Sequence, residues 1–307
     1  MASLRSMIVD GNRFASPPDM TAAQDETELA YVSHTLTLLR SQETVLVNAD
    51  KVARDLTEAM TQGVEVRDHP LIPCPKPPFH RIWLECNQRF RSGALVERKD
   101  IRPGEDPLEA LTISGKTCEL EEIKVFQMLR QQQPATVVMA HAWQEIASRA
   151  AASFLGELLY WLDGNGNWQG GTVVPFPPEA ANVDDRMNVL DSFLVWVLHT
   201  FARLNCHNVK LVPMKAGAPS AKQLRKHHAP STVWHEIVVE EVQVRAKRDA
   251  PASGEKQELR FHRVRGHYAD YTKGAGLFGK YKLRLWVEEH ARGNPELGEV
   301  VGSYSVQ

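Results

Sequence analysis

The chain has 307 residues, of which 43% are hydrophobic and 24% are charged, values close to the average for globular proteins. Its 36 Lys and Arg residues nearly balance its 38 Asp and Glu residues, which leaves a formal charge of −2. This composition excludes a collagen-like, coiled-coil or wholly disordered chain. It also means that a nucleic-acid-binding role requires local clustering of positive charge.

The longest apolar runs, such as residues 193–198, are much shorter than the ~20 residues of a membrane-spanning helix. Residues 1–10 contain no sustained apolar segment, so we expect no secretory signal. The cysteines are widely spaced and form no C-x-x-C pair, which predicts neither a zinc knuckle nor a disulfide framework. We therefore expect a cytoplasmic protein with no membrane contact, no cofactor and no metal site.

Residues 1–27 mix Ser, Pro, Asp and Gly without periodicity and are expected to form a flexible arm. A helical spacing of apolar residues follows the arm, and a second short helix is expected after Asp50. The proline-rich segment 70–78 excludes a helix and leads into expected strands at 80–86 and 94–98.

A β-branched segment at 136–140 predicts a further strand. Residues 154–162 and 172–176 flank the sequence Asp163-Gly-Asn-Gly-Asn167, which favours a hairpin, with a helix as the alternative for the first arm. Residues 184–205 carry apolar side chains at a 3.6-residue period and predict the clearest helix.

The composition changes after Met214. Residues 215–230 are expected to form a basic linker, and strand-like segments follow from 231 to 307. We therefore predict an α+β fold, in which a mixed N-terminal domain at 28–214 contains a long amphipathic helix. A smaller, β-rich, basic C-terminal module at 231–307 follows it.

Residues 256–292 contain nine cations and four anions, a local balance of +5 in a chain whose total is −2. Aromatic residues alternate with these cations. Because cations neutralise phosphates and aromatic rings stack on unpaired bases, the combination favours single-stranded RNA over a duplex groove. The residues expected to form this nucleic-acid or partner surface are Arg263, Arg265, His267, Tyr268, Tyr271, Lys280, Lys282, Arg284, Trp286 and Arg292.

Two other motifs are given structural interpretations. Gly274-Ala-Gly-Leu-Phe-Gly279 matches G-x-G-x-x-G, but the segment after it alternates like a strand, whereas a dinucleotide site needs a helix there. We therefore expect a hairpin loop at this motif. His141 and Glu145 form an H-x-x-x-E pair, to which we assign a structural role.

His262, His267 and Arg265 are candidate catalytic residues for an alternative function, metal-independent cleavage of RNA. One imidazole would accept the 2′-hydroxyl proton, the other would protonate the leaving oxygen, and arginine would stabilise the developing charge. The opposing interpretation is that both histidines bond to backbone and fix a loop. A protein–protein interaction surface with aromatic and arginine anchors is a further alternative, as is a plain solvated face.

The segment His262-Arg-Val-Arg-Gly-His-Tyr268, with Tyr271, Lys282–Trp286 and His290-Ala-Arg-Gly293 after it, resembles a C-terminal pattern in proteins of phages and other mobile elements. It is similar to the C-terminal part of the type V-A anti-CRISPR family, which is associated with interference in production of the CRISPR effector nuclease. The resemblance implies a phage- or mobile-element-encoded regulatory protein. Such a protein would act in the host cytoplasm by engaging RNA or a ribonucleoprotein, a nascent polypeptide, or both.

Overall fold

The computed structural model describes residues 4–11, 32–41, 43–62, 66–68, 71–87, 91–107, 121–146, 151–176, 183–214, 233–240, 260–292 and 294–299. The chain divides into two compact units. The larger unit comprises Met1–Asn205 and Leu211–Ile237, and the smaller unit comprises Cys206–Lys210 and Val238–Gln307.

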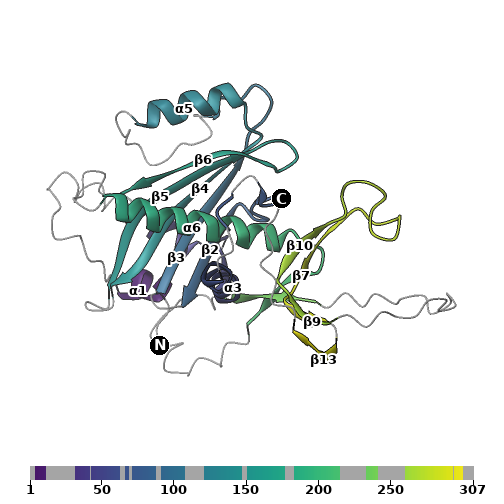
Figure 1. The fold of residues 1–307 in the computed structure, drawn as a ribbon. Coiled ribbons are helices and arrows are strands. Elements are labelled where there is room, and N and C mark those ends of the chain that lie inside the picture. The colour runs from purple at the N-terminus through teal and green to yellow at the C-terminus, as the bar shows by residue number, and fades with distance from the viewer. Residues whose placement is uncertain are drawn as a thin grey trace. The chain divides into compact units, whose positions relative to one another are not determined.

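Eight strands of the described chain form one mixed sheet (Figure 1). Their order is β6 (Trp168–Pro175), β5 (Ala151–Leu162), β4 (Thr136–Ile146), β3 (Arg91–Asp100), β2 (Arg81–Asn87), β1 (Val45–Asn48), β8 (Trp234–Val239) and β7 (Val209–Pro213). Strands β2 to β6 are consecutive and antiparallel. Strand β1 is parallel to both of its neighbours, β2 and β8.

This sheet shows that the predicted fold class is wrong. The chain is not a helix-rich N-terminal domain followed by a small β-module. It is dominated by the sheet, and its longest helix, α6 (Val183–Leu204), has 22 residues. Strand β8, which we expected in the C-terminal module, pairs with β1 so that Trp234 lies opposite Leu46. The predicted fold class gave α6 too much importance because a 3.6-residue period is easy to recognise in a sequence. Strands that are buried on both faces appear instead as continuous apolar runs, which do not distinguish a strand from a helix.

One face of the sheet, here called the α6 face, is covered by helices α3 (Asp50–Thr61) and α6. Helix α6 packs on β5 and β6, and α3 packs on β2 and on α6 (Figure 1). Arg203 of α6 donates a hydrogen bond of 2.5 Å to the Asp55 carboxylate of α3. Because Arg203 is buried, this ion pair fixes the two helices against each other.

The opposite face, here called the α1 face, carries two separate hydrophobic clusters. The larger one joins α1 (Leu4–Gly11), the helical residues 32–40 and the sheet. Its fully or nearly fully buried members are Leu4, Ile8, Val32, Leu38, Leu39, Leu46, Trp83, Leu95, Trp143, Ala152, Phe154 and Phe176. The smaller cluster joins α5 (Glu121–Gln132) to β4 and β5 through Leu129, Val137 and Trp161. The part of the face between the two clusters is available for polar side chains.

Helix α1 replaces part of the expected flexible arm. Glu85 of β2 accepts hydrogen bonds from the backbone N–H of Leu4 at 2.8 Å and of Arg5 at 3.1 Å, and from Trp83 Nε1 at 3.0 Å. Burial raises the pKa of Glu85, while these three bonds and the charge of Arg91 oppose that rise. The carboxylate therefore supplies acceptors to the first backbone donors of α1, which have no partner within the helix. Residues 12–27 of the expected arm lie outside the described residues.

A β-bulge in β5 adapts this strand to both faces of the sheet. The register shifts so that Ala142 opposes Gly156 whereas Trp143 opposes Phe154, which leaves Leu155 extra. The shift turns Phe154 toward the α1 face while Gly156 lies against α6. Gly156 has φ +148, and a Cβ there would stand 2.2 Å from the Val174 carbonyl oxygen. Glycine is therefore required at this position.

Several elements expected from the sequence are confirmed. The helix after the arm occupies residues 32–40, and α3 and α6 follow the predicted spans closely. The predicted hairpin is formed by β5 and β6, and Asp163 Oδ1 accepts the backbone N–H groups of Asn165 and Asn167 in its turn. Elements α1, α5 and β1 were not expected. Residues 215–230, proposed as the basic linker, lie outside the described residues.

In the described part of the smaller unit, two small sheets are formed. One pairs β10 (His267–Asp270) with β11 (Arg284–Val287), and the other has the order β12 (His290–Arg292), β9 (Arg260–Val264), β13 (Asn294–Glu299). Across the described residues of the whole chain, no helix combines the length and the apolar character that crossing a bilayer requires.

We expect Glu85→Gln to lower the free energy of unfolding by about 1–3 kcal/mol. The glutamine NH2 group would replace one carboxylate oxygen, so that one of the backbone or indole N–H donors would lose its acceptor. Urea denaturation of the full-length protein measures this effect. Glu43→Gln is the matched control, since the Glu43 side chain is 85% exposed. Equal unfolding midpoints for the two variants would show that Glu85 does not hold α1.

Candidate nucleic-acid interface

The basic aromatic segment forms a two-stranded hairpin in the smaller unit. In the antiparallel register of β10 and β11, Tyr268 lies opposite Trp286 and Asp270 lies opposite Arg284. The Tyr268 and Trp286 rings make an edge-to-face contact with centroids 4.9 Å apart. Arg284 Nε donates to Asp270 Oδ2 at 3.0 Å. An aromatic pair and an ion pair therefore lock the register of this hairpin.

A segment distant in sequence completes the edge of β11. Asn208 Nδ2 donates to the Trp286 carbonyl at 2.8 Å, and the Trp286 backbone N–H donates to Asn208 Oδ1 at 2.9 Å. The backbone N–H of His207 also donates to the Arg284 carbonyl at 2.8 Å. The asparagine amide thus imitates a neighbouring strand, and Trp286 is left only 7% exposed.

Asp270 begins the loop that joins the two strands. Its Oδ1 accepts the backbone N–H of Thr272 at 2.8 Å and the Thr272 hydroxyl at 2.6 Å. Partial burial raises the pKa of Asp270, but the bonds from Thr272 and the bond and charge of Arg284 outweigh it and lower the pKa overall. The carboxylate is therefore ionised at neutral pH and holds the base of the loop.

The glycine motif lies in this loop, as expected from the strand-like sequence after it. Gly274, Gly276 and Gly279 all have positive φ, and a Cβ on Gly276 would stand 2.7 Å from the Tyr281 carbonyl oxygen. The backbone N–H of Leu277 donates to the Tyr281 carbonyl at 2.9 Å, and the Tyr281 N–H donates to the Leu277 carbonyl at 3.0 Å. Lys282 Nζ donates to the Gly274 carbonyl. The loop is therefore ordered by its own hydrogen bonds.

The tip of the loop exposes two aromatic rings. Phe278 is 62% exposed and Tyr281 is 56% exposed, the two largest exposed fractions of any described aromatic residue. Phe278 also has φ +54, a conformation that is uncommon for a bulky residue. Lys273 and Lys280 are exposed beside them, and residues 271–283 contain no acidic side chain. The tip thus combines apolar rings with uncompensated positive charge.

The predicted surface residues divide according to their environment. Arg265, His267, Lys280, Lys282 and Arg292 are exposed, and Tyr268 and Tyr271 are half-buried. Trp286 is buried against Tyr268, and Arg284 is paired with Asp270, so these two residues stabilise the hairpin. The side chain of Arg263 lies outside the described residues. The proposed surface is therefore centred on the loop rather than on the strands.

The two histidines considered for catalysis lie on strands of different sheets. His262 lies on β9 with its backbone opposite Arg292, and its side chain is outside the described residues. His267 lies on β10, where its Nδ1 is 2.9 Å from the Arg265 carbonyl oxygen. This contact to backbone is the arrangement expected of a histidine that shapes the local chain.

Sequence inspection placed Lys273, Phe278 and Tyr281 in the basic region but not among the surface residues. The signal that identifies them is their position within or next to the segment Gly274–Gly279, because a tight turn leaves its large side chains without neighbours to pack against. Trp286 could not be assigned to the interior from local sequence, since the residue that covers its backbone is Asn208.

No protein-family model matches the chain, no curated protein matches it, and no solved structure matches it. The function of the chain is therefore inferred from its own residues.

Proposed function

We propose that this protein is a regulatory protein that binds single-stranded RNA through the loop of the β10–β11 hairpin. The observation that supports the proposal is the coincidence, on one ordered turn, of the exposed rings of Phe278 and Tyr281 with the exposed ammonium groups of Lys273 and Lys280. Arg265, which lies between β9 and β10, His267 of β10 and Arg292 of β12 are further exposed residues of the same unit.

The chemistry of the loop suits unpaired bases. A base stacked on an aromatic side chain contributes ~1–3 kcal/mol, and such stacking requires bases that are not already stacked in a duplex. Lysine ammonium groups bind the phosphates between stacked bases and release counterions. Because the turn is already ordered by the Leu277–Tyr281 hydrogen bonds, little further conformational entropy is lost on binding.

The biological setting of the proposal comes from the resemblance of segment 262–293 to the type V-A anti-CRISPR family. On that basis the protein is encoded by a phage or mobile element and acts in the host cytoplasm. The RNA is then a message of the host defence, bound alone or beside its nascent polypeptide, and the consequence is reduced production of the effector nuclease. The basic strand that ends in Trp286 and the preceding Arg-Gly-His-Tyr sequence support this assignment.

We expect Phe278→Ala and Tyr281→Ala each to weaken the binding of single-stranded RNA roughly 5- to 150-fold, the loss that corresponds to one stacked base. Fluorescence anisotropy with a labelled oligonucleotide and the full-length protein measures the affinity. Phe79→Ala is the matched control, because Phe79 is a 40% exposed ring of the larger unit. Equal affinities for all three variants and the original chain would reject stacking at the loop. Stoichiometric capture of one protein after nuclease treatment, without RNA binding, would favour a protein-interaction surface instead.

We expect the double variant Lys273→Ala, Lys280→Ala to reduce the slope of log affinity against log salt concentration by about 1.4, since each phosphate contact on a single strand contributes ~0.7. Filter binding across a salt series measures the slope. Lys99→Ala is the control, because Lys99 is an exposed lysine of β3 in the larger unit. An unchanged slope in the double variant, or an equal decrease in the control, would contradict phosphate binding at the loop.

A further inference from the structure

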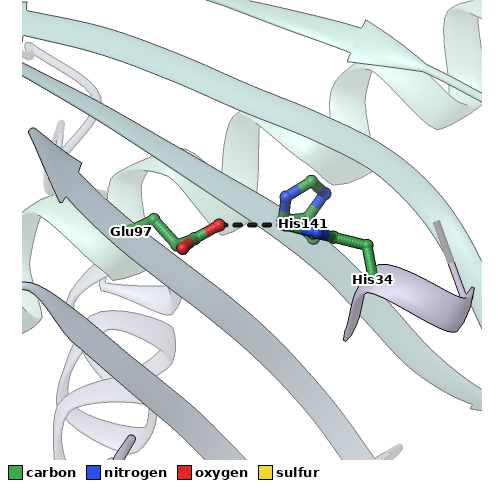
Figure 2. A group of neighbouring side chains, drawn as sticks. All are labelled: His34, Glu97 and His141. Atoms are coloured by element: carbon green, nitrogen blue, oxygen red, sulfur yellow. Dashed lines mark hydrogen bonds and ion pairs between the residues drawn. The ribbon is translucent and has the colours of Figure 1, made fainter. Parts of the chain in front are cut away.

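A second chemically distinctive group lies in the larger unit, on the α1 face of the sheet. His34 comes from the helical residues 32–40, Glu97 from β3 and His141 from β4, and their side chains point toward one another (Figure 2). One possible ligand atom of each residue lies within 4.8 Å of those of the other two. His34 Nε2 is 3.1 Å from Glu97 Oε2, and the His34 and His141 ring centroids are 5.6 Å apart.

Strand register produces this grouping. In the antiparallel register of the sheet, His141 lies between Leu95 of β3 and Glu157 of β5, and Glu97 is two residues from Leu95 on the same face. Along β4 on this face, His141 follows Met139 and precedes Trp143. The group therefore lies between the smaller hydrophobic cluster of this face, which includes Val137, and the larger one, which includes Trp143.

We propose that His34, Glu97 and His141 bind a divalent transition-metal ion, and that zinc is the ion their chemistry suits. Two imidazoles and one carboxylate form a ligand set that zinc accepts at bond lengths of ~2.0–2.2 Å. Tetrahedral coordination at those lengths places ligand atoms roughly 3.3 Å apart, so a modest contraction of the observed group encloses an ion. The soft-to-borderline character of imidazole disfavours calcium and magnesium, which prefer oxygen ligands.

The surrounding residues orient the ligands. Glu157 Oε1 lies 3.4 Å from His141 Nδ1, and a carboxylate beside one ring nitrogen leaves the other nitrogen for the metal. Arg81 Nε lies 3.4 Å from Glu97 Oε1, which leaves Oε2 directed toward His34. The carboxylates of Glu97 and Glu157 and the guanidinium of Arg81 together give the group a net charge of −1, which favours a bound cation.

Two of the three ligands, His141 and Glu97, are in the protonation state that binds a metal. Burial, and after it the charge of His34, lower the pKa of His141 to about 4, so that its imidazole is neutral near pH 7. Burial raises the pKa of Glu97, but the hydrogen bond and charge of His34 and the charges of His141 and Arg81 outweigh it, so that the carboxylate is ionised.

An ion can reach this group from solvent. His141 has no exposed side-chain surface, whereas the side chains of His34 and Glu97 are each 25% exposed. The two partly exposed ligands therefore form the entrance and His141 forms the floor. Three protein ligands leave a fourth tetrahedral position for water or a small ligand, the pattern found at zinc sites that are not purely structural.

The proposal is tested by isothermal titration of zinc chloride into the full-length protein after treatment with EDTA. We expect one equivalent of zinc per chain, and with cobalt(II) the visible absorption bands of tetrahedral coordination. His34→Gln and Glu97→Gln should weaken zinc binding by about 100-fold or more, because each removes a ligand. Glu157→Gln should weaken it ~10- to 100-fold, the effect of losing a group that orients a ligand.

The control is His80→Gln, which alters an exposed histidine of the larger unit outside the group. It should leave zinc affinity unchanged. His34 and Glu97 are preferred to the fully buried His141 for substitution, and thermal unfolding of each variant verifies that it is folded. Failure of the original chain to bind zinc or cobalt at one equivalent would overturn the proposal, and so would affinities of His34→Gln and Glu97→Gln equal to that of His80→Gln.

Discussion

Strand register is the constraint on which the rest of this structure depends. Successive side chains of a strand point to opposite faces, so a slip of one residue between β3 and β4 would place Glu97 and His141 on opposite sides of the sheet. The bulge at Leu155 restores the alternation that brings Phe154 into the larger hydrophobic cluster of the α1 face while Glu157 remains opposite His141. In the smaller unit, the register of β10 and β11 likewise decides that Trp286 meets Tyr268 and that Arg284 meets Asp270.

Features determined by local sequence could be predicted. The 3.6-residue period identified α6, and the Asp163-Gly-Asn-Gly-Asn167 turn identified the β5–β6 hairpin, because hydrogen bonds within the turn itself select that conformation. The accumulation of cations and rings in residues 256–292 is also local, and simple counting finds it. In each of these cases, residues that are close in sequence supply both the signal and the structure.

Features determined by distant partners could not be predicted. Helix α1 has only eight residues, too few to be stable alone, and its first backbone donors are satisfied by Glu85, some eighty residues further along the chain. His34 and Glu97 are separated by 63 positions, and each looks like an ordinary polar residue in its own segment. The expectation of no metal site rested on the spacing of cysteines, histidines and carboxylates along the sequence, which carries no information about a group assembled from one helix and two strands.

The difference between local and distant determinants also explains why counting aromatic residues did not identify which rings are exposed. A small unit has little core, so a large side chain such as Trp286 is needed inside it, where the Asn208 amide satisfies the Trp286 backbone and Tyr268 packs against the ring. Once the strands of the hairpin are stabilised in this way, the loop can hold Phe278 at a positive φ with its ring in solvent. The contact between Tyr268 and Trp286 therefore stabilises the strands of the hairpin, whereas Phe278 and Tyr281 are the most exposed of the described aromatic residues.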